Sequence, residues 1–268
     1  MQPESQSAEL LQTVCLGPKL RRTFSAEARG RYAACVTRSL ARWVHRQLVA
    51  HYGRPDWETK YAPLEELIGT ILSQHTSDIN SERAFSALTA AYSSWESVRD
   101  APVDELSATI RSGGLAVVKA HRIQAVLHVL STFDGQVQLP DLCRMRRRRA
   151  IELLTSLPGV GRKTAACVLL FGSHIPAIPV DTHVHRVSLR LGLVRHGTGP
   201  EATTEALEAA IAPRDYYAFH VNLIRLGREI CKAPRPRCEV CPLRERCTTS
   251  PYASNRRSAR QFDPRQLA

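Results

Sequence analysis

Hydrophobic residues recur along this chain with the three-to-four-residue period of amphipathic helices, while the alternation typical of half-buried strands does not recur. Leu40, Val44 and Leu48, for example, fall on one side of a helix, and Gly53 follows as a stop signal. The same pattern predicts helices over Val36–Tyr52, Pro63–Leu72, Asn80–Tyr92, Val103–Arg111, Ala116–Phe133, Arg147–Ser156, Arg162–Phe171, Thr182–Leu191, Glu201–Ile211 and Tyr216–Ile230. The fold class is therefore predicted to be all-α, with short connections.

The two ends of the chain are less strongly patterned. Residues 1–34 are expected to be partly disordered, and so is the basic tail that starts at Ser250. Either Asp78 or Asn80 is expected to cap the helix that begins near residue 80. At 268 residues, the chain has the length of one large or two modest domains.

The charge balance favours a polyanionic partner. Lys and Arg total 37 against 25 Asp and Glu, a net charge of +12, and the pI is near 9.7. Charge spread evenly over an ordinary basic protein is the alternative. No apolar stretch is long enough to span a membrane, and residues 1–30 lack the apolar core of a secretory signal. We therefore expect a cytosolic protein whose cysteines are ligands or free thiols.

Four cysteines near the C-terminus have the spacing C-x6-C-x2-C-x5-C, at Cys231, Cys238, Cys241 and Cys247. Four thiolates can hold one iron–sulfur cube. A zinc site is the alternative, although the x6 and x5 gaps fit a zinc ribbon poorly. The other cysteines lack ligand spacing and are interpreted as small apolar residues or surface thiols: Cys15, Cys35, Cys143 and Cys167.

A second motif, Leu157-Pro-Gly-Val-Gly-Arg-Lys-Thr-Ala165, separates two predicted helices. Gly159 and Gly161 permit backbone conformations that other residues avoid. Free amides in such a turn at a helix N-terminus form an anion pocket that suits a DNA phosphate. An ordinary tight turn is the alternative. Arg162 and Lys163, in the first helical turn, favour the phosphate site.

Lys163 and Asp181 are the candidate catalytic residues. A lysine amine is a nucleophile only when neutral, and burial together with the positive end of the helix favours that form. A phosphate contact or a solvated charge is the alternative for Lys163. Asp181 directly precedes a helix, where an aspartate usually serves as the N-cap. The cap needs one carboxylate oxygen, so Asp181 can also act as a base or an electrostatic partner.

These motifs together resemble the endonuclease III family of helix-hairpin-helix DNA glycosylases. The resemblance rests on the hairpin motif, on Val180-Asp-Thr-His183 with Asp181 eighteen residues beyond Lys163, and on the four cysteines; it runs from Leu64 to Cys247. It implies two helical domains flanking a DNA-binding cleft, with the damaged base flipped out. The expected parts are an N-terminal extension (1–35), a helical barrel with the hairpin (62–172), an iron–sulfur domain (36–61 and 173–249) and the tail (250–268).

The resemblance also implies an activity in base excision repair. Lys163 matches the nucleophile that attacks the sugar C1′, and Asp181 the carboxylate that assists it. A Schiff base on Lys163 and β-elimination would follow, giving a bifunctional DNA N-glycosylase and abasic-site lyase that removes oxidised pyrimidines. The expected partner is double-stranded DNA with damaged bases or abasic sites, with no membrane, for a monomer that is cytoplasmic, or nucleoid-associated in a bacterium. A structural [4Fe-4S] cluster would shape the loop that carries Lys232, Arg235 and Arg237, which suit phosphate contacts.

Two segments depart from the family pattern. In Ile71-Leu-Ser-Gln-His-Thr-Ser-Asp78, His75 takes the place of the family's gap-filling Gln, with Gln74 before it. Either side chain can enter the hole left by a flipped base, while a partly buried helix-end histidine is the alternative for His75. In the second segment Leu115 keeps the apolar wedge that pushes between bases. Ala116-Val117-Val118 replaces the family's Tyr-Asn-Ser, which bears on substrate range.

Arg144 and Arg146–Arg149 form a basic run before the hairpin, interpreted as an auxiliary backbone contact or as a solvated helix face. Three other functions are weighed against the leading one. An adenine-mispair glycosylase is disfavoured because those enzymes generally lack the lysine. A damage- or abasic-site-binding homologue with little turnover is favoured by the changes at His75 and residues 116–118. For an electron carrier, nothing indicates a second redox centre.

Overall fold

The computed structural model describes residues 26–253, with side chains from residue 38 onward. Helices make up the regular structure of this range, which has one isolated bridge, between Ser131 and Val137, and no strand. The helices are α2 (Ala26–Tyr52), α3 (Pro63–Leu72), α4 (Asp78–Ala91), α5 (Trp95–Asp100), α6 (Val103–Thr109), α7 (Ala116–Val129), α8 (Arg147–Thr155), α9 (Arg162–Cys167), α10 (Thr182–Leu191), α11 (Pro200–Ala210) and α12 (Tyr216–Glu229). The all-α prediction is confirmed.

Several helix boundaries differ from the predicted ones. Helix α2 begins at Ala26 rather than Val36. Helix α5 was not predicted, because six residues are too few to show a period; a reciprocal pair of hydrogen bonds between Ser94 and Ser97 begins it. Helix α7 ends at Val129 rather than Phe133. Helix α9 continues into a π-helical segment, Val168–Gly172.

The cap of α4 is Ser77 rather than Asp78 or Asn80. The Ser77 hydroxyl accepts a hydrogen bond from the Asn80 amide at 3.3 Å, and Ser77 itself has extended backbone angles. Asp78 already lies inside the helix. Its carboxylate instead pairs with Arg228 of α12, with 2.5 Å between Oδ2 and Nη1.

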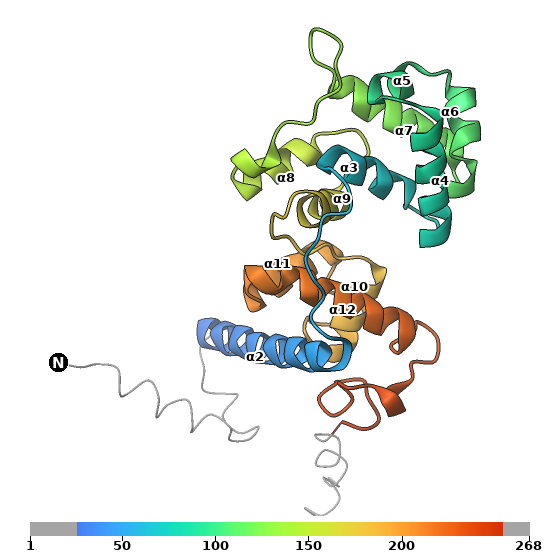
Figure 1. Cartoon of the computed structure of the whole chain (residues 1–268). Coiled ribbons are helices and arrows are strands. Elements are labelled where there is room, and N and C mark those ends of the chain that lie inside the picture. Colours follow the sequence, from blue (N-terminus) through green and yellow to red (C-terminus); the bar gives the residue numbers. More distant parts are fainter. Residues whose placement is uncertain (1–25, 254–268) are drawn as a thin grey trace, which may run out of the picture.

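The buried apolar side chains form two clusters, which correspond to the two lobes in Figure 1. The first lobe contains α3–α9, and its cluster runs from Leu67 to Ala177. The second contains α2 and α10–α12, with cluster members in residues 41–48 and 170–247. The described part of the chain thus starts in the second lobe with α2, crosses to the first lobe at residues 53–62, and returns to the second lobe after α9 (Figure 1). The exact domain boundaries stay a prediction.

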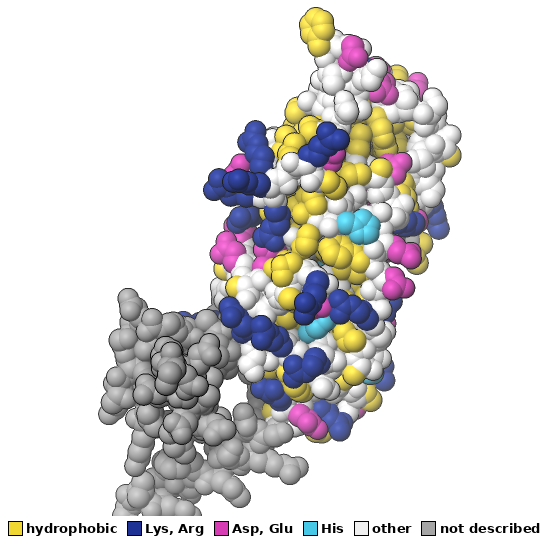
Figure 2. All heavy atoms as spheres, turned by 60° about the vertical axis from the view of Figure 1, so that its left-hand side comes forward, with side chains coloured by type: hydrophobic (Ala, Val, Ile, Leu, Met, Phe, Trp, Pro, Cys, Tyr) yellow, Lys and Arg dark blue, Asp and Glu magenta, His cyan; other side chains and the backbone are white. Residues whose placement is uncertain are grey.

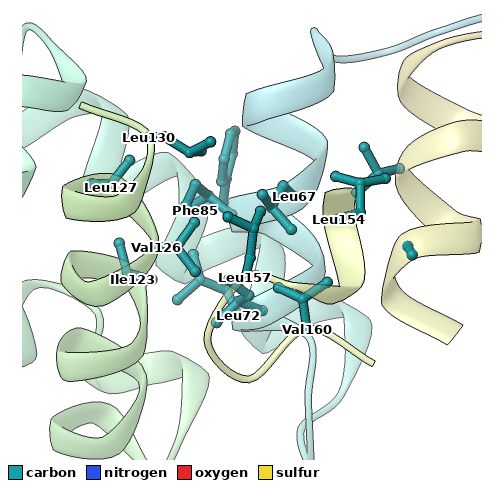
Figure 3. Close-up of a cluster of buried hydrophobic side chains, with 14 of the residues drawn as sticks. Leu67, Leu72, Phe85, Ile123, Val126, Leu127, Leu130, Leu154, Leu157 and Val160 are labelled. Carbon is teal, nitrogen blue, oxygen red and sulfur yellow. The ribbon is translucent and has the colours of Figure 1, made fainter. Parts of the chain in front are cut away.

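The core of the first lobe holds the hairpin in place. In Figure 3, Leu157 and Val160 of the hairpin point toward Leu67 and Leu72 of α3, beside side chains from α7. Both hairpin side chains are buried. Burial of these two residues therefore fixes the turn that leads into α9.

Polar contacts join the two lobes. Arg147 of α8 donates to the Pro176 carbonyl at 3.1 Å and pairs with Glu208 of α11 at 2.5 Å. Asp78 of α4 and Arg228 of α12 form a second pair between the lobes, while the hydrogen bonds from the Ile178 amide to Glu208 and from the Trp57 indole to the Leu170 carbonyl (2.7 Å) lie on the side of the second lobe. The relative position of the lobes thus rests on hydrogen bonds as well as on packing.

The predicted tail begins later than expected, because Ser250 and Ala253 are both buried. The remaining predictions of disorder, for residues 1–25 and 254–268, lie outside the described residues. Within residues 26–253, none of the helices combines the length and the apolar character needed to cross a membrane.

Candidate active site

The hairpin has one glycine that its backbone requires and one that it does not. Gly159 has φ +71, the left-handed region that favours glycine. Gly161, the N-cap of α9, has φ −90 and ψ 174, which any residue adopts. The prediction of an unusual backbone is therefore wrong for Gly161. A side chain added there would meet no atom within 4 Å, so the surface around its backbone is open.

Lys163 lies in the first turn of α9, and its side chain is exposed. The expected burial of Lys163 is therefore absent in the free protein. In the same helix, Thr164 and Cys167 are buried. The start of α9 thus presents the Lys163 amine to solvent, while the neighbouring side chains of the helix pack into the interior.

Asp181 is the N-cap of α10, as expected. Its Oδ1 accepts from the Val184 amide at 2.7 Å. In the part of the chain whose side chains are described, Oδ2 has neither a hydrogen-bond nor an ion-pair partner. One oxygen therefore holds the helix start, and the other remains available.

A group of titratable side chains brings Lys163 and Asp181 into one electrostatic neighbourhood. Burial raises the pKa of Cys167 to about 11. The charge of Lys163 lowers this pKa, and the charges of Glu66 and Asp181 raise it. Burial also raises the pKa of Glu66 to about 7, against the opposing charge of Lys163. Glu66 cannot be recognised as part of this site from the sequence, because its helix carries no motif that separates it from surface carboxylates.

His220 of α12 is also part of this neighbourhood. Its ring is 2% exposed, and Nδ1 has no hydrogen-bond partner. Burial lowers the pKa of His220, while the Asp181 charge raises it and the Lys163 charge lowers it. The ring also donates a hydrogen bond to the carbonyl of Pro179, two residues before Asp181. A lone histidine on the apolar face of α12 was the only available sequence signal.

Arg162 faces the second lobe. Its guanidinium lies 3.7 Å from the carboxylate of Glu205 and 3.9 Å from that of Glu201, and both glutamates lie in the first half of α11. The three side chains are exposed, so these pairs contribute little to stability. A polyanion can therefore displace the two carboxylates at low cost.

The two segments that depart from the family pattern both have strained, exposed residues. His75 has φ +54 and is exposed, so the alternative of a partly buried histidine is wrong. Leu115 has φ +49 and is 58% exposed. Val117 and Val118 are exposed beside it. Gln74 is only half-buried, and its side-chain oxygen accepts from Arg122 of α7.

The four motif cysteines converge on one cavity of about 130 Å³, which all four line. They are free thiols. Burial raises the pKa of the Cys241 thiol to about 11. Among the residues with described side chains, no three possible ligands converge on the position of a single metal ion. Of the other cysteines, Cys167 is buried and Cys143 exposed, in line with the prediction; Cys15 and Cys35 lie outside the described side chains.

Two arginines of α10, not identified from the sequence, anchor the loop that carries these cysteines. Arg186 donates to the carbonyls of Gly227 (2.8 Å) and Cys231 (3.1 Å). Arg190 donates to the carbonyls of Lys232 (2.7 Å) and Ala233 (2.8 Å), and lies 3.5 Å from the Cys231 sulfur. Their i, i+4 spacing after Asp181 was the available signal.

The predicted phosphate contacts of this loop are on the surface. Lys232, Arg235 and Arg237 are all exposed, and Arg235 has φ +54. Arg237 lies 4.0 Å from Glu239. The basic run near α8 is mixed: Arg147 joins the lobes, while Arg144, Arg148 and Arg149 pair with Asp141 or Glu152 in their own segment.

Comparisons with known proteins identify the family to which this chain belongs. Residues 68–213 match the HhH-GPD superfamily of base excision DNA repair proteins. Endonuclease III of Thermotoga maritima is 39% identical over 204 residues, covering 75% of this chain and 89% of that protein. Endonuclease III of Bacillus subtilis is 36% identical over 186 residues, covering 69% and 80%.

Solved structures agree with these relatives. A trapped covalent endonuclease III–DNA intermediate, the estranged-adenine complex, has a TM-score of 0.69 at 31% identity, covering 79% of this chain and 96% of that one. A non-covalent endonuclease III–DNA complex has the same TM-score at 30% identity, covering 84% and 99%. The chain belongs to the endonuclease III family of the HhH-GPD superfamily.

Proposed function

We propose that this protein binds damaged duplex DNA and removes oxidised pyrimidines through a Schiff base on Lys163. Membership of the family makes it a base excision repair DNA glycosylase with abasic-site lyase activity. The lesion class and the residue roles are the proposed part. The observation that supports them best is the exposed Lys163 at the start of α9. It shares an electrostatic neighbourhood with Asp181, whose Oδ1 caps α10 while Oδ2 remains available.

The reaction uses the amine first as a nucleophile. Neutral Lys163 Nζ attacks C1′ of the extruded nucleotide, the bond from C1′ to the base breaks, and the base leaves with the bonding electrons. Oδ2 of Asp181 stabilises the positive charge that develops on the sugar. The bond from C1′ to O4′ then breaks as a proton passes from Nζ to O4′, which leaves a Schiff base between Lys163 Nζ and C1′. Loss of a proton from C2′ then breaks the bond from C3′ to its oxygen, which is the β-elimination.

DNA itself supplies the desolvation that the free protein lacks. Because Lys163 is exposed, its amine is hydrated until a DNA backbone covers it. The open backbone at Gly161 lets a phosphate approach, and Arg162 can exchange Glu201 and Glu205 for that phosphate. Figure 2 shows Lys and Arg side chains gathered over both lobes on one face, which suits a polyanion.

The four-cysteine cavity fits a [4Fe-4S] cluster. Thiolates ligate the separate irons of a cube, so their sulfurs need not converge on one point. Cys231, Cys238, Cys241 and Cys247 would hold the cluster, which would stiffen the loop and take no part in the bond-breaking steps. Arg186 and Arg190 would then keep the exposed Lys232 and Arg235 at fixed positions for phosphate contacts.

A damage-binding homologue with little turnover is the second candidate, favoured by the exposed Val117 and Val118 in place of polar family residues. Both candidates act as monomers on DNA, and the compartment we propose is the cytoplasm, or the nucleoid in a bacterium.

Borohydride trapping separates the two candidates. The purified protein is mixed with duplexes carrying thymine glycol or an abasic site, and borohydride reduces any Schiff base to a stable adduct. We expect trapping on both DNAs. Lys163→Ala should abolish the adduct and leave DNA affinity within about threefold, because one phosphate-facing cation among many is lost.

Lys60→Ala is the matched control, since Lys60 is an exposed lysine engaged with Glu82 at 2.5 Å. It should trap like the original protein. Adduct formation that survives Lys163→Ala would contradict the nucleophile assignment. Tight binding to both duplexes without any adduct would favour the damage-binding candidate instead.

A further inference from the structure

Lys119 of α7 is a charged side chain buried in an otherwise apolar core. It is 2% exposed, and its amine donates to the carbonyl of Leu72 at 2.6 Å and to that of Gly113 at 2.7 Å. No acidic side chain in residues 38–253 forms an ion pair with it. Burial, and then the Arg122 charge, lower its pKa. A neutral apolar residue would avoid this desolvation, so packing alone does not account for a lysine here.

The two carbonyls belong to the segments that depart from the family pattern. Leu72 ends α3, and the turn with Gln74 and His75 follows it directly. Gly113 ends a short 3-10 helix, and the wedge residue Leu115 comes two positions later. Both segments contain an exposed residue in the left-handed region, which needs support from its surroundings. Lys119 provides one anchor common to both.

Arg122, one helical turn further along α7, extends the same connection. Its Nη1 donates to Oε1 of Gln74. Its side chain also lies directly over Gly159, where an added Cβ would come within 2.3 Å of Arg122 Nε. One face of α7 therefore contacts the turn, the wedge segment and the hairpin. These three segments are far apart in the sequence and are the ones expected to meet DNA.

We propose that Lys119, assisted by Arg122, is a positioning residue that holds the 73–76 turn and the wedge segment in register for base extrusion. The inference rests on the proposed function. Extrusion needs one side chain in the vacated hole and another between the neighbouring bases at the same time. Two hydrogen bonds from a single ammonium set the separation of the two segments. Displacement of either by about 1 Å would lower the rate of extrusion strongly.

The test compares Lys119→Met with Gln124→Met. Gln124 is buried on the same helix, and its amide donates to the carbonyls of Ala101 at 2.7 Å and Val98 at 3.3 Å, away from the three segments. Each substitution removes two hydrogen bonds to main-chain carbonyls and introduces an unbranched apolar side chain of similar size. The readouts are Tm, fluorescence of 2-aminopurine opposite the lesion, single-turnover base release from thymine glycol DNA, and trapping on a ready-made abasic site.

We expect Lys119→Met to slow extrusion and base release by about tenfold to a hundredfold. Trapping on the abasic site should fall less, because a sugar without a base is easier to extrude. Gln124→Met should keep both activities at a similar Tm. If Lys119→Met does not fold, Lys119→Gln, whose side chain is shorter and uncharged, should show the same selective loss.

Two results would overturn the inference. The first is a folded Lys119 variant that extrudes the base as fast as the wild type, in an experiment where the wild type forms the trapped adduct. That result would leave the proposed function intact. The second is an equal loss in Gln124→Met, which would make the effect one of stability. A wild type that neither extrudes the base nor traps would instead remove the proposed function and this inference together.

Discussion

The hairpin (Leu157–Gly161) and the cysteine loop (Cys231–Cys247) both present exposed cations or open backbone, but different interactions hold them. The hairpin is anchored by Leu157 and Val160, which are buried in the core of the first lobe. The cysteine loop buries few apolar side chains, chiefly Leu243, and relies on carbonyls bonded by Arg186 and Arg190. Apolar anchoring works without a bound group, whereas a loop built on polar contacts around a cavity depends on what fills it.

Disrupting the cysteine site should produce the largest effect. Cys238→Ser removes one of the four proposed cluster ligands, and the free energy of metal binding in such sites is itself folding free energy. We expect loss of the visible absorption of the proposed cluster, rapid tryptic cleavage after Lys232 and Arg237, and a DNA-binding salt slope reduced by about 2 to 3 as positioned cations are lost.

Cys143→Ser is the matched control, because Cys143 is exposed and outside the cavity. It should behave like the original protein in all three measurements. A Cys238→Ser protein that keeps a protease-resistant loop and its full salt slope would show that the polar contacts suffice, which would break the contrast between the two regions.

Loss of an apolar anchor should come next. Leu157→Ala leaves a cavity in the first-lobe core and should cost about 2–5 kcal/mol in the free energy of unfolding. Urea denaturation measures this loss. Leu153→Ala, at a half-buried position of the preceding helix, should cost less. A loss below about 1 kcal/mol for Leu157→Ala would mean that the core does not hold the hairpin.

The smallest expected effect concerns Glu66, a carboxyl of the first lobe that faces the Lys163 neighbourhood. Burial raises the pKa of Glu66 from 4.5 to about 7, so the folded protein binds this proton more tightly than the unfolded chain. The stabilisation from this group is complete below pH 4.5 and is lost as pH rises through 7. Glu66→Gln keeps a neutral side chain of the same shape. It should retain about 1–2 kcal/mol that the original protein loses between pH 5 and pH 8.

Urea unfolding of both proteins across this pH range checks the prediction. Parallel pH profiles would show that Glu66 is ionised and well solvated in the folded state. In that case Glu66 would contribute nothing to the anchoring of the first lobe, and the contrast with the cysteine loop would become sharper.

Much of the site is visible in the sequence because its signals are local. Helical periodicity, the hairpin glycines, the cap at Asp181 and the spacing of the four cysteines each depend on residues a few positions apart. The structure agrees on the all-α class, on the cap and on a cavity shared by the four cysteines.

The tertiary structure alone decided which side chains meet and which are covered. It exposed Lys163 where burial was expected, and it buried Lys119, which the sequence does not distinguish from a surface lysine. It also brought Arg122 to Gln74 and Gly159. Burial and pairing depend on elements distant in the chain, whose packing no local pattern encodes. The chemistry available to this protein was therefore readable from its sequence, while the positioning of that chemistry was decided by how the helices pack.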